Sequence, residues 1–307
     1  MKYLSQEILD FTSNNITDDF SVWDSTKTYI LETDDTNLTD DSVVRYGHYY
    51  YRSLVNDNLN FNPVDYENIK WVKWGVSNRY AMIDLASGTK SVLNDNIVIE
   101  FERNLIDTLT LGYFKASKIV VEHLENGTVL SDYTQTFTYS ANDTVLDYWD
   151  YFYDVYSVSV DRALKVDIPY IGDTIKITLY TETTTNEAYI GYLVGGHSVD
   201  MGDTLYGVNF SFNSFAIKET DDFGTLNIIK RNVQDLVDFE TIIDTGTLPE
   251  LKREVKKIYN DIVVFIVDDS DNDVLENLLT LGVIENASIV LNDPVKSVMT
   301  WSIIESI

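Results

Sequence analysis

The side chains best suited to acid, base or metal chemistry near neutral pH are three histidines, His48, His123 and His197. They stand far apart in the sequence and share no spacing typical of a metal site. The sequence has no Cys, which excludes disulfides, thiolate metal ligands and a Cys nucleophile. It also has no G-x-S-x-G elbow, P-loop or HExxH motif. We therefore expect a protein that is not an enzyme and that uses no metal and no cofactor.

Carboxylates are too numerous in this sequence to mark a site. There are 50 acidic and 22 basic residues, a formal net charge of -28, so the surface repels phosphate and no binding to nucleic acid is expected. Residues 268–273 place carboxylates at alternate positions, as a calcium-binding EF-hand loop does. However, Val274 and Thr280 occupy the places of the Gly and Glu that such a loop requires. We interpret this string as a solvated acidic turn.

Large aromatic side chains crowd into residues 22–85. The apolar face of a sugar stacks on exposed Trp and Tyr rings, which suggests a glycan-binding platform made of Trp23, Tyr50, Trp71 and Trp74. A domain this small also needs large aromatic side chains to bury enough area for stability. The sequence leaves both roles open. We expect the structural role to dominate, with glycan binding as the alternative.

The elements that carry these residues divide a mainly β chain into four segments. Residues 1–19 are predicted to be an N-terminal helical segment, because apolar residues recur in it at helical spacing. Residues 20–84 are predicted to form a small aromatic-rich β module resembling carbohydrate-binding modules. Residues 85–217 are predicted to form a central antiparallel β-sandwich of jelly-roll type. Residues 218–307 are predicted to form a small α+β domain that serves assembly.

The prediction of a sandwich rests on short runs of alternating apolar and polar residues. In Thr174–Tyr180 the residues Ile175, Ile177 and Leu179 alternate with polar neighbours, which indicates a strand buried on one face. The pair Asn126-Gly127 lies between two such runs, and both residues tolerate positive φ, so they predict a hairpin turn. The aromatic run 147–156 fits either a strand or a helical turn.

Residues 249–259 have the apolar spacing of an amphipathic helix, with a Pro near its start. The predicted solvent face of this helix carries four cations, Lys252, Arg253, Lys256 and Lys257. In so acidic a chain, such a face is suited to an acidic surface on a neighbouring subunit. A helix face that is merely solvated is the alternative.

Several blocks of the sequence resemble known families. The order of aromatic residues from Trp23 to Trp71 resembles small chitin- and cellulose-binding modules. Three further blocks resemble segments of virion proteins of tailed bacteriophages. These blocks are SNRYAMID at residues 77–84, GDTLYG at residues 202–207 and KETDDFG at residues 218–224.

The resemblance implies a structural component of a phage tail, baseplate or tail tip that acts as a multimeric assembly and docking protein. It implies partnership with other tail or baseplate proteins and with copies of itself, and a place in the virion tail after assembly in the host cytoplasm. The alternative is a carbohydrate-binding adhesin that recognises host surface glycans. No run of about 18 apolar residues occurs in the sequence, so membrane insertion is not expected.

Overall fold

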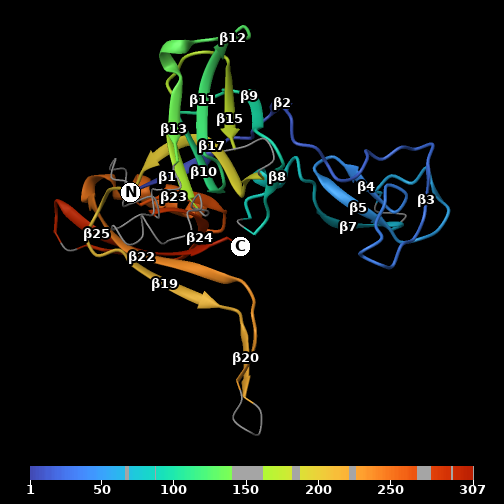
Figure 1. The fold of residues 1–307 in the computed structure, drawn as a ribbon. Coiled ribbons are helices and arrows are strands. Elements are labelled where there is room, and N and C mark those ends of the chain that lie inside the picture. Colours follow the sequence, from blue (N-terminus) through green and yellow to red (C-terminus); the bar gives the residue numbers. More distant parts are fainter. Residues whose placement is uncertain are drawn as a thin grey trace, which may run out of the picture.

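The computed structural model describes residues 1–65, 69–86, 88–139, 162–181, 187–220, 226–267, 278–291 and 293–306. Within these residues the protein is mainly β and sandwich-like, which confirms the predicted fold class. Figure 1 shows a central body of packed sheets, with the aromatic module on one side of it. A narrow β-ribbon projects from another side of this body (Figure 1).

The largest sheet of the described structure has ten strands. Nine of them follow one another across the sheet, and the tenth, β19, pairs with β22 near the far edge. In spatial order these strands are β14 (Arg162–Asp167), β10 (Thr108–Phe114), β17 (Tyr192–Asp200), β1 (Lys2–Gln6), β23 (Val263–Ile266), β24 (Leu279–Val290), β25 (Lys296–Glu305), β22 (Val233–Asp244) and β18 (Asp203–Thr204), with β19 at Asn209–Ser214.

A second sheet of six strands covers one part of the first. Its order is β12 (Thr128–Val129), β11 (Lys118–Glu125), β15 (Thr174–Tyr180), β9 (Ile97–Glu102) and β2 (Phe11–Asn14), with β13 (Gln135–Thr138) also on β11. The aromatic module holds β4 (Val43–Tyr46), β5 (Tyr49–Ser53) and β7 (Trp71–Val76), and the pair β3 (Thr28–Tyr29) and β6 (Asn58–Leu59). The remaining pairs are β8 (Ser91–Leu93) with β16 (Ala188–Ile190), and β20 (Ile217–Thr220) with β21 (Leu226–Ile229).

Two large hydrophobic cores lie against the ten-stranded sheet. The first fills the sandwich and contains the alternating residues Ile175, Ile177 and Leu179, as the sequence predicts. The second lies under helix α2 (Leu248–Ile258), which buries Leu251, Val255 and Ile258 against strands of the same sheet. The predicted amphipathic helix is therefore confirmed. Three short 3₁₀ helices complete the described elements: η1 (Ala81–Ile83), η2 (Ser131–Tyr133) and η4 (Thr245–Thr247).

The helix predicted within residues 1–19 is wrong, because this segment forms the strands β1 and β2. Strand β1 pairs with β17 on one side and with β23 on the other. Its neighbouring residues Tyr3 and Leu4 are both fully buried, and they point into different cores on the two faces of the sheet. Ile8, which helical spacing assigns to the apolar side, is 80% exposed.

The sequence predicts separate domains before and after residue 217, but the pairing of β1 joins strands of both segments in one sheet. Strands β10, β14 and β17 precede that residue, yet they lie in one continuous sheet with β22 to β25. Strand β1 makes this continuity possible because it fills the space between β17 and β23. Gly196 on β17 lies so close to β1 that a Cβ at this position would overlap the carbonyl of Ser5.

The hairpin predicted at Asn126-Gly127 is confirmed. Strand β11 pairs with β12 through Glu125 and Thr128, which leaves a two-residue turn. Asn126 and Gly127 have φ angles of 50° and 76°, as a type I′ turn requires. The aromatic run 147–156 and the acidic string 268–273 lie outside the described residues.

His123 is a titratable group with no contact to water in the sandwich, where it is fully buried on β11. Burial lowers its pKa from the ordinary 6.5, and the nearby charge of Arg103 acts in the same direction, while a backbone contact at Ile171 opposes them. The folded protein therefore holds this imidazole neutral in a pH range where the unfolded chain binds a proton.

This difference predicts that stability falls when the pH drops below about 6.5, because only the unfolded state gains the proton there. We expect the melting temperature to decrease between pH 7.5 and pH 5.5. In His123→Leu this decrease should be smaller, whatever the stability of the variant at pH 7.5. Calorimetry over this pH range measures both slopes, and equal slopes would contradict the assignment to His123.

The position of β1 predicts a large effect of a small truncation. Leu4→Ala removes a side chain that packs against both halves of the sheet, and the free energy of unfolding should decrease by about 2–5 kcal/mol. Ile8→Ala is the matched control, and it should change stability by no more than about 0.5 kcal/mol because Ile8 is exposed. Urea unfolding measures both. Equal effects of the two substitutions would show that β1 does not join the halves.

Candidate functional site

The aromatic module builds its core from the residues that could have formed a sugar platform. Tyr29, Val44, Tyr51 and Trp71 are buried together around the sheet of β4, β5 and β7. The rings of Tyr29 and Trp71 meet edge to face with centroids 5.1 Å apart. The indole Nε1 of Trp71 donates a hydrogen bond of 2.9 Å to the carbonyl of Phe61. Such a ring supports the module and cannot stack on a ligand.

The structure does not bring the four predicted platform residues together on a surface. Tyr50 and Trp71 are only 4% and 5% exposed. Trp23 is half-buried, and Trp74 is 46% exposed beside Phe20, with ring centroids 6.0 Å apart. The platform is therefore reduced to Trp74 and Phe20, and Phe20 was not among the predicted residues.

The hydroxyl of Tyr50 joins the module to the segment before it. It accepts a hydrogen bond of 2.8 Å from the backbone N–H of Asp19, and burial raises the pKa of Tyr50 to about 12. Nearby, the carboxylate of Asp18 lies 2.8 Å from the guanidinium of Arg45 and also accepts the backbone N–H of Arg79. These polar contacts hold Asp18 and Asp19, which precede the module, against its sheet.

Residues 77–84 form a clamp between the module and the sandwich. The amide of Asn78 donates to the carbonyls of Thr17 and Val92 at 2.9 and 2.8 Å. The guanidinium of Arg79 donates to the carbonyls of Ile16 and Asn14 at 3.2 and 3.4 Å. Because these partners lie in the segments before and after the module, the block SNRYAMID connects two parts of the fold.

The four cations predicted for an interface lie on two neighbouring rows of helix α2, and all are exposed. Arg253 and Lys257 face a groove beside the helix, whereas Lys252 and Lys256 do not line it. Lys257 lies 3.9 Å from Glu254, an exposed pair that contributes little to stability. The helix thus offers a cationic row, Lys252 and Lys256, that is separate from the groove.

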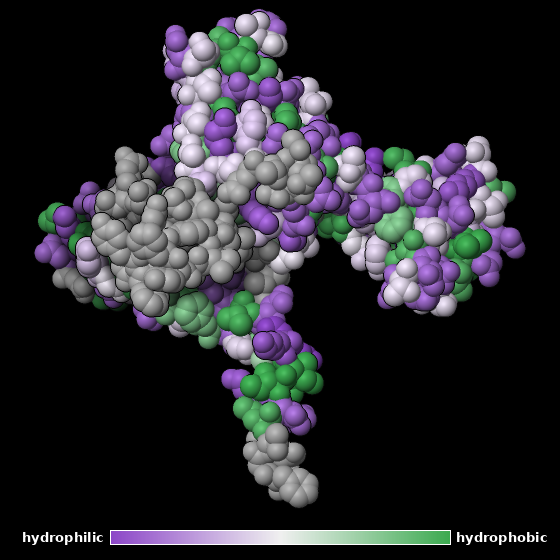
Figure 2. All heavy atoms as spheres, in the orientation of Figure 1, coloured by the Kyte–Doolittle hydropathy of each residue, from purple (hydrophilic) through white to green (hydrophobic). Residues whose placement is uncertain are grey.

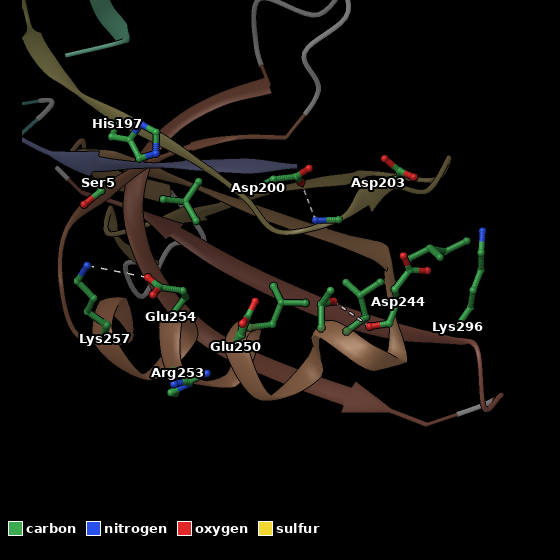
Figure 3. Close-up of a pocket in the computed structure, with 16 residues that line it drawn as sticks. Ser5, His197, Asp200, Asp203, Asp244, Glu250, Arg253, Glu254, Lys257 and Lys296 are labelled. Atoms are coloured by element: carbon green, nitrogen blue, oxygen red, sulfur yellow. Dashed lines mark hydrogen bonds and ion pairs between the residues drawn. The ribbon is translucent and has the colours of Figure 1, made fainter. Parts of the chain in front are cut away.

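The groove itself was not predicted from the sequence. It has a volume of about 800 Å³ and lies between α2 and the strands β17, β18 and β22 (Figure 3). Its apolar lining comes from Val199, Ile242, Ile243 and Leu251. Its wall also carries carboxylates from separate parts of the chain, namely Asp200, Asp203, Asp244, Glu250 and Glu254.

The projecting β-ribbon, which we call the arm, comprises β20, β21 and the adjoining residues 230–232. It extends the longer ribbon of β19 and β22 away from the body (Figure 1). Figure 2 shows apolar residues gathered along this projection. Leu226, Ile228 and Ile229 are each at least half exposed. Sequence reasoning missed this exposure because short isoleucine-rich runs are also typical of buried strands.

Neither a metal site nor a membrane-spanning helix is found in the described part of the chain. No group of three or more His, Cys, Asp or Glu side chains there could hold a metal ion. Among the same residues, no helix has the length and apolar character needed to cross a bilayer. His48, His123 and His197 do not meet; the Nδ1 of His197 instead contacts the carboxylate of Asp107.

No protein-family model, curated protein or solved structure matches this chain. The choice of a function therefore depends on the surfaces described above and on the sequence motifs that lie at them.

Because Trp71 is buried and Trp74 is exposed, their removal should affect stability to very different extents. Trp71→Ala should lower the free energy of unfolding of the module by about 3–5 kcal/mol, because it empties the core around Tyr29. Trp74→Ala should leave the melting temperature nearly unchanged. Thermal melting and a glycan array, applied to both variants, measure stability and binding. Loss of glycan binding in Trp74→Ala without a change in melting would favour a sugar-binding role.

Proposed function

We propose that the protein is a structural component of a bacteriophage tail, baseplate or tail tip and acts there as a multimeric docking protein. The observation that carries this proposal is the arm, whose strands β20 and β21 pair only with each other in the described structure. An isolated two-stranded ribbon is marginally stable in water. Burying a Leu or Ile side chain contributes up to about 1.5–3 kcal/mol, so a partner surface would stabilise the arm considerably.

The positions of the phage-like motifs also support the proposal. The block GDTLYG begins at Gly202 and Asp203, which line the groove beside α2. The block KETDDFG begins in β20 of the arm, at Lys218. The described residues at the start of these two blocks thus lie at two surfaces suited to contacts. The proposed partners are other tail or baseplate proteins and copies of this chain, and the proposed location is the virion tail.

The proposal assigns no catalytic step to the chain. The sequence contains no nucleophile motif, and its net charge of -28 disfavours contact with nucleic acid. The alternative function, a carbohydrate-binding adhesin, keeps one supporting observation, the exposed Trp74 next to Phe20. A single exposed indole offers one stacking face, which is a weaker basis than the arm.

The proposal predicts that the cationic row on α2 takes part in assembly. Lys252→Glu combined with Lys256→Glu should reduce incorporation into particles several-fold, because it places negative charge where an acidic neighbour is expected. The fold should remain intact, since both side chains are exposed. Quantifying the protein in purified particles measures incorporation, and circular dichroism checks the fold.

Lys252→Arg with Lys256→Arg is the matched control, which keeps the positive charge and should be incorporated normally. Normal incorporation of the double Glu variant would exclude this face as an interface. Absence of the unmodified protein from purified particles would refute the proposed function as a whole.

A further inference from the structure

The arm exposes apolar side chains on both of its faces. Ile217 pairs directly with Ile229, so these two side chains share one face of the ribbon. Leu226 and Ile228 lie on the opposite face, because successive side chains of a strand alternate. A surface that covers only one face would leave the other in water. The arm is therefore suited to insertion between walls rather than to lying on a flat surface.

The arm also carries cations, which are concentrated at its base. Lys218, Lys230 and Arg231 are exposed in the arm. None of these three cations makes an ion pair within the described residues. In the sequence of residues 217–232 these three cations are matched by three carboxylates, Glu219, Asp221 and Asp222, so the positive charge is concentrated at the base, at Lys230 and Arg231.

The groove beside α2 complements the arm, because it is both apolar and negatively charged. It combines walls on two sides with an apolar lining, and its five carboxylates outnumber its three cations, Arg253, Lys257 and Lys296. Among its carboxylates, Asp200, Asp203 and Asp244 form no ion pair in the described part of the chain. An apolar segment with neighbouring cations can therefore pack against the apolar lining and form ion pairs with the carboxylates.

The arm of a given copy cannot reach its own groove. The arm and the groove lie at opposite ends of β22, a strand of 12 residues. Val233 begins the strand next to the arm, whereas Ile242 to Asp244 at the other end line the groove. These ends are about 36 Å apart at about 3.3 Å per residue, and the arm points away from the body (Figure 1). An arm that docks in the groove must therefore come from another molecule.

We infer that the arm of one copy docks in the α2 groove of a second copy of this chain. This inference rests on the proposed function as a multimeric docking protein and identifies the contact. The apolar side chains meet the lining of the groove, and Lys230 and Arg231 lie near its carboxylates. Two copies that exchange arms about a two-fold axis would form a closed dimer, whereas copies that dock head to tail would close into a ring or extend as a filament.

Light scattering coupled to size-exclusion chromatography of the full-length chain tests the contact. The unmodified protein should form dimers or larger oligomers at high concentration. An arm variant, Ile228→Asp with Ile229→Asp, should weaken association at least tenfold. A groove variant, Asp200→Lys with Asp203→Lys, should do the same. Ile69→Asp is the matched control, because Ile69 is 75% exposed on the aromatic module, and it should associate normally.

Mixing the two defective variants gives the decisive result. The arm variant keeps an intact groove and the groove variant keeps an intact arm, so a head-to-tail contact forms one heterodimer and stops there. The mixture should elute as a dimer, whereas each variant alone elutes as a monomer. Failure of the mixture to dimerise, or normal association of either variant alone, would overturn the inference. A second variant, Lys230→Asp with Arg231→Asp, should restore binding to the Asp200→Lys, Asp203→Lys groove.

The outcome separates the inference from the proposed function. An unmodified protein that stays monomeric at all concentrations but is incorporated into particles refutes the contact between copies and leaves the proposed function intact. Oligomers that respond to the arm and groove variants, in a protein absent from particles, support the contact and refute the virion role. Association that depends on the arm but not on the groove variant refutes the groove as its binding site.

Discussion

The backbone ladders on both sides of β1 join two groups of strands that are distant in sequence. On one side β1 continues the strands of the sandwich through Tyr3 and Val199, and on the other side it continues the C-terminal strands through Tyr3 and Phe265. A central strand of this kind satisfies its own N–H and C=O groups on both edges and buries side chains on both faces. The position of every surface on the C-terminal strands relative to the sandwich follows from this pairing.

The same strand sets the position of helix α2. The hydroxyl of Tyr3 donates a hydrogen bond of 2.6 Å to the carboxylate of Glu254, and both burial and this bond raise the pKa of Tyr3. Ser5 of β1 also lines the groove beside the helix. Because β22 runs from the groove to the arm, a single rigid sheet fixes the distance between these two surfaces. A geometry that is constant in every copy is what a repeating assembly requires.

The sequence alone correctly predicts those elements whose residue pattern is compatible with only one local structure. The alternation in β15, the turn at Asn126-Gly127 and the apolar spacing of α2 each identify one local structure, and all three are confirmed. The segment of β1 was predicted wrongly because Leu4 and Ile8 fit a helical period. The burial of both Tyr3 and Leu4 instead depends on pairing with β17 and β23, whose residues Val199 and Phe265 lie far along the chain. Pairing at that separation leaves no trace in the local pattern.

The surfaces were harder to predict than the fold, for two physical reasons. The groove gathers side chains from Ser5 to Lys296, so its carboxylates are scattered among the 50 acidic residues of the chain. The possible glycan platform is not formed as a surface for a different reason. Tyr50 and Trp71 have the residue types of a sugar site, but both are buried in the core of a small module. Residue type alone does not distinguish a ring that binds from a ring that supports.

The strong negative charge restricts the proposed contacts between copies to localised surfaces. Two molecules that each carry a net charge of -28 repel each other, although salt limits this repulsion to about 8 Å at physiological ionic strength. A contact then forms only where apolar burial and local cations offset the repulsion. The arm combines exposed isoleucines with Lys230 and Arg231, and it projects beyond the acidic body. Charge repulsion over the rest of the surface disfavours other modes of association, which would make the proposed docked geometry specific.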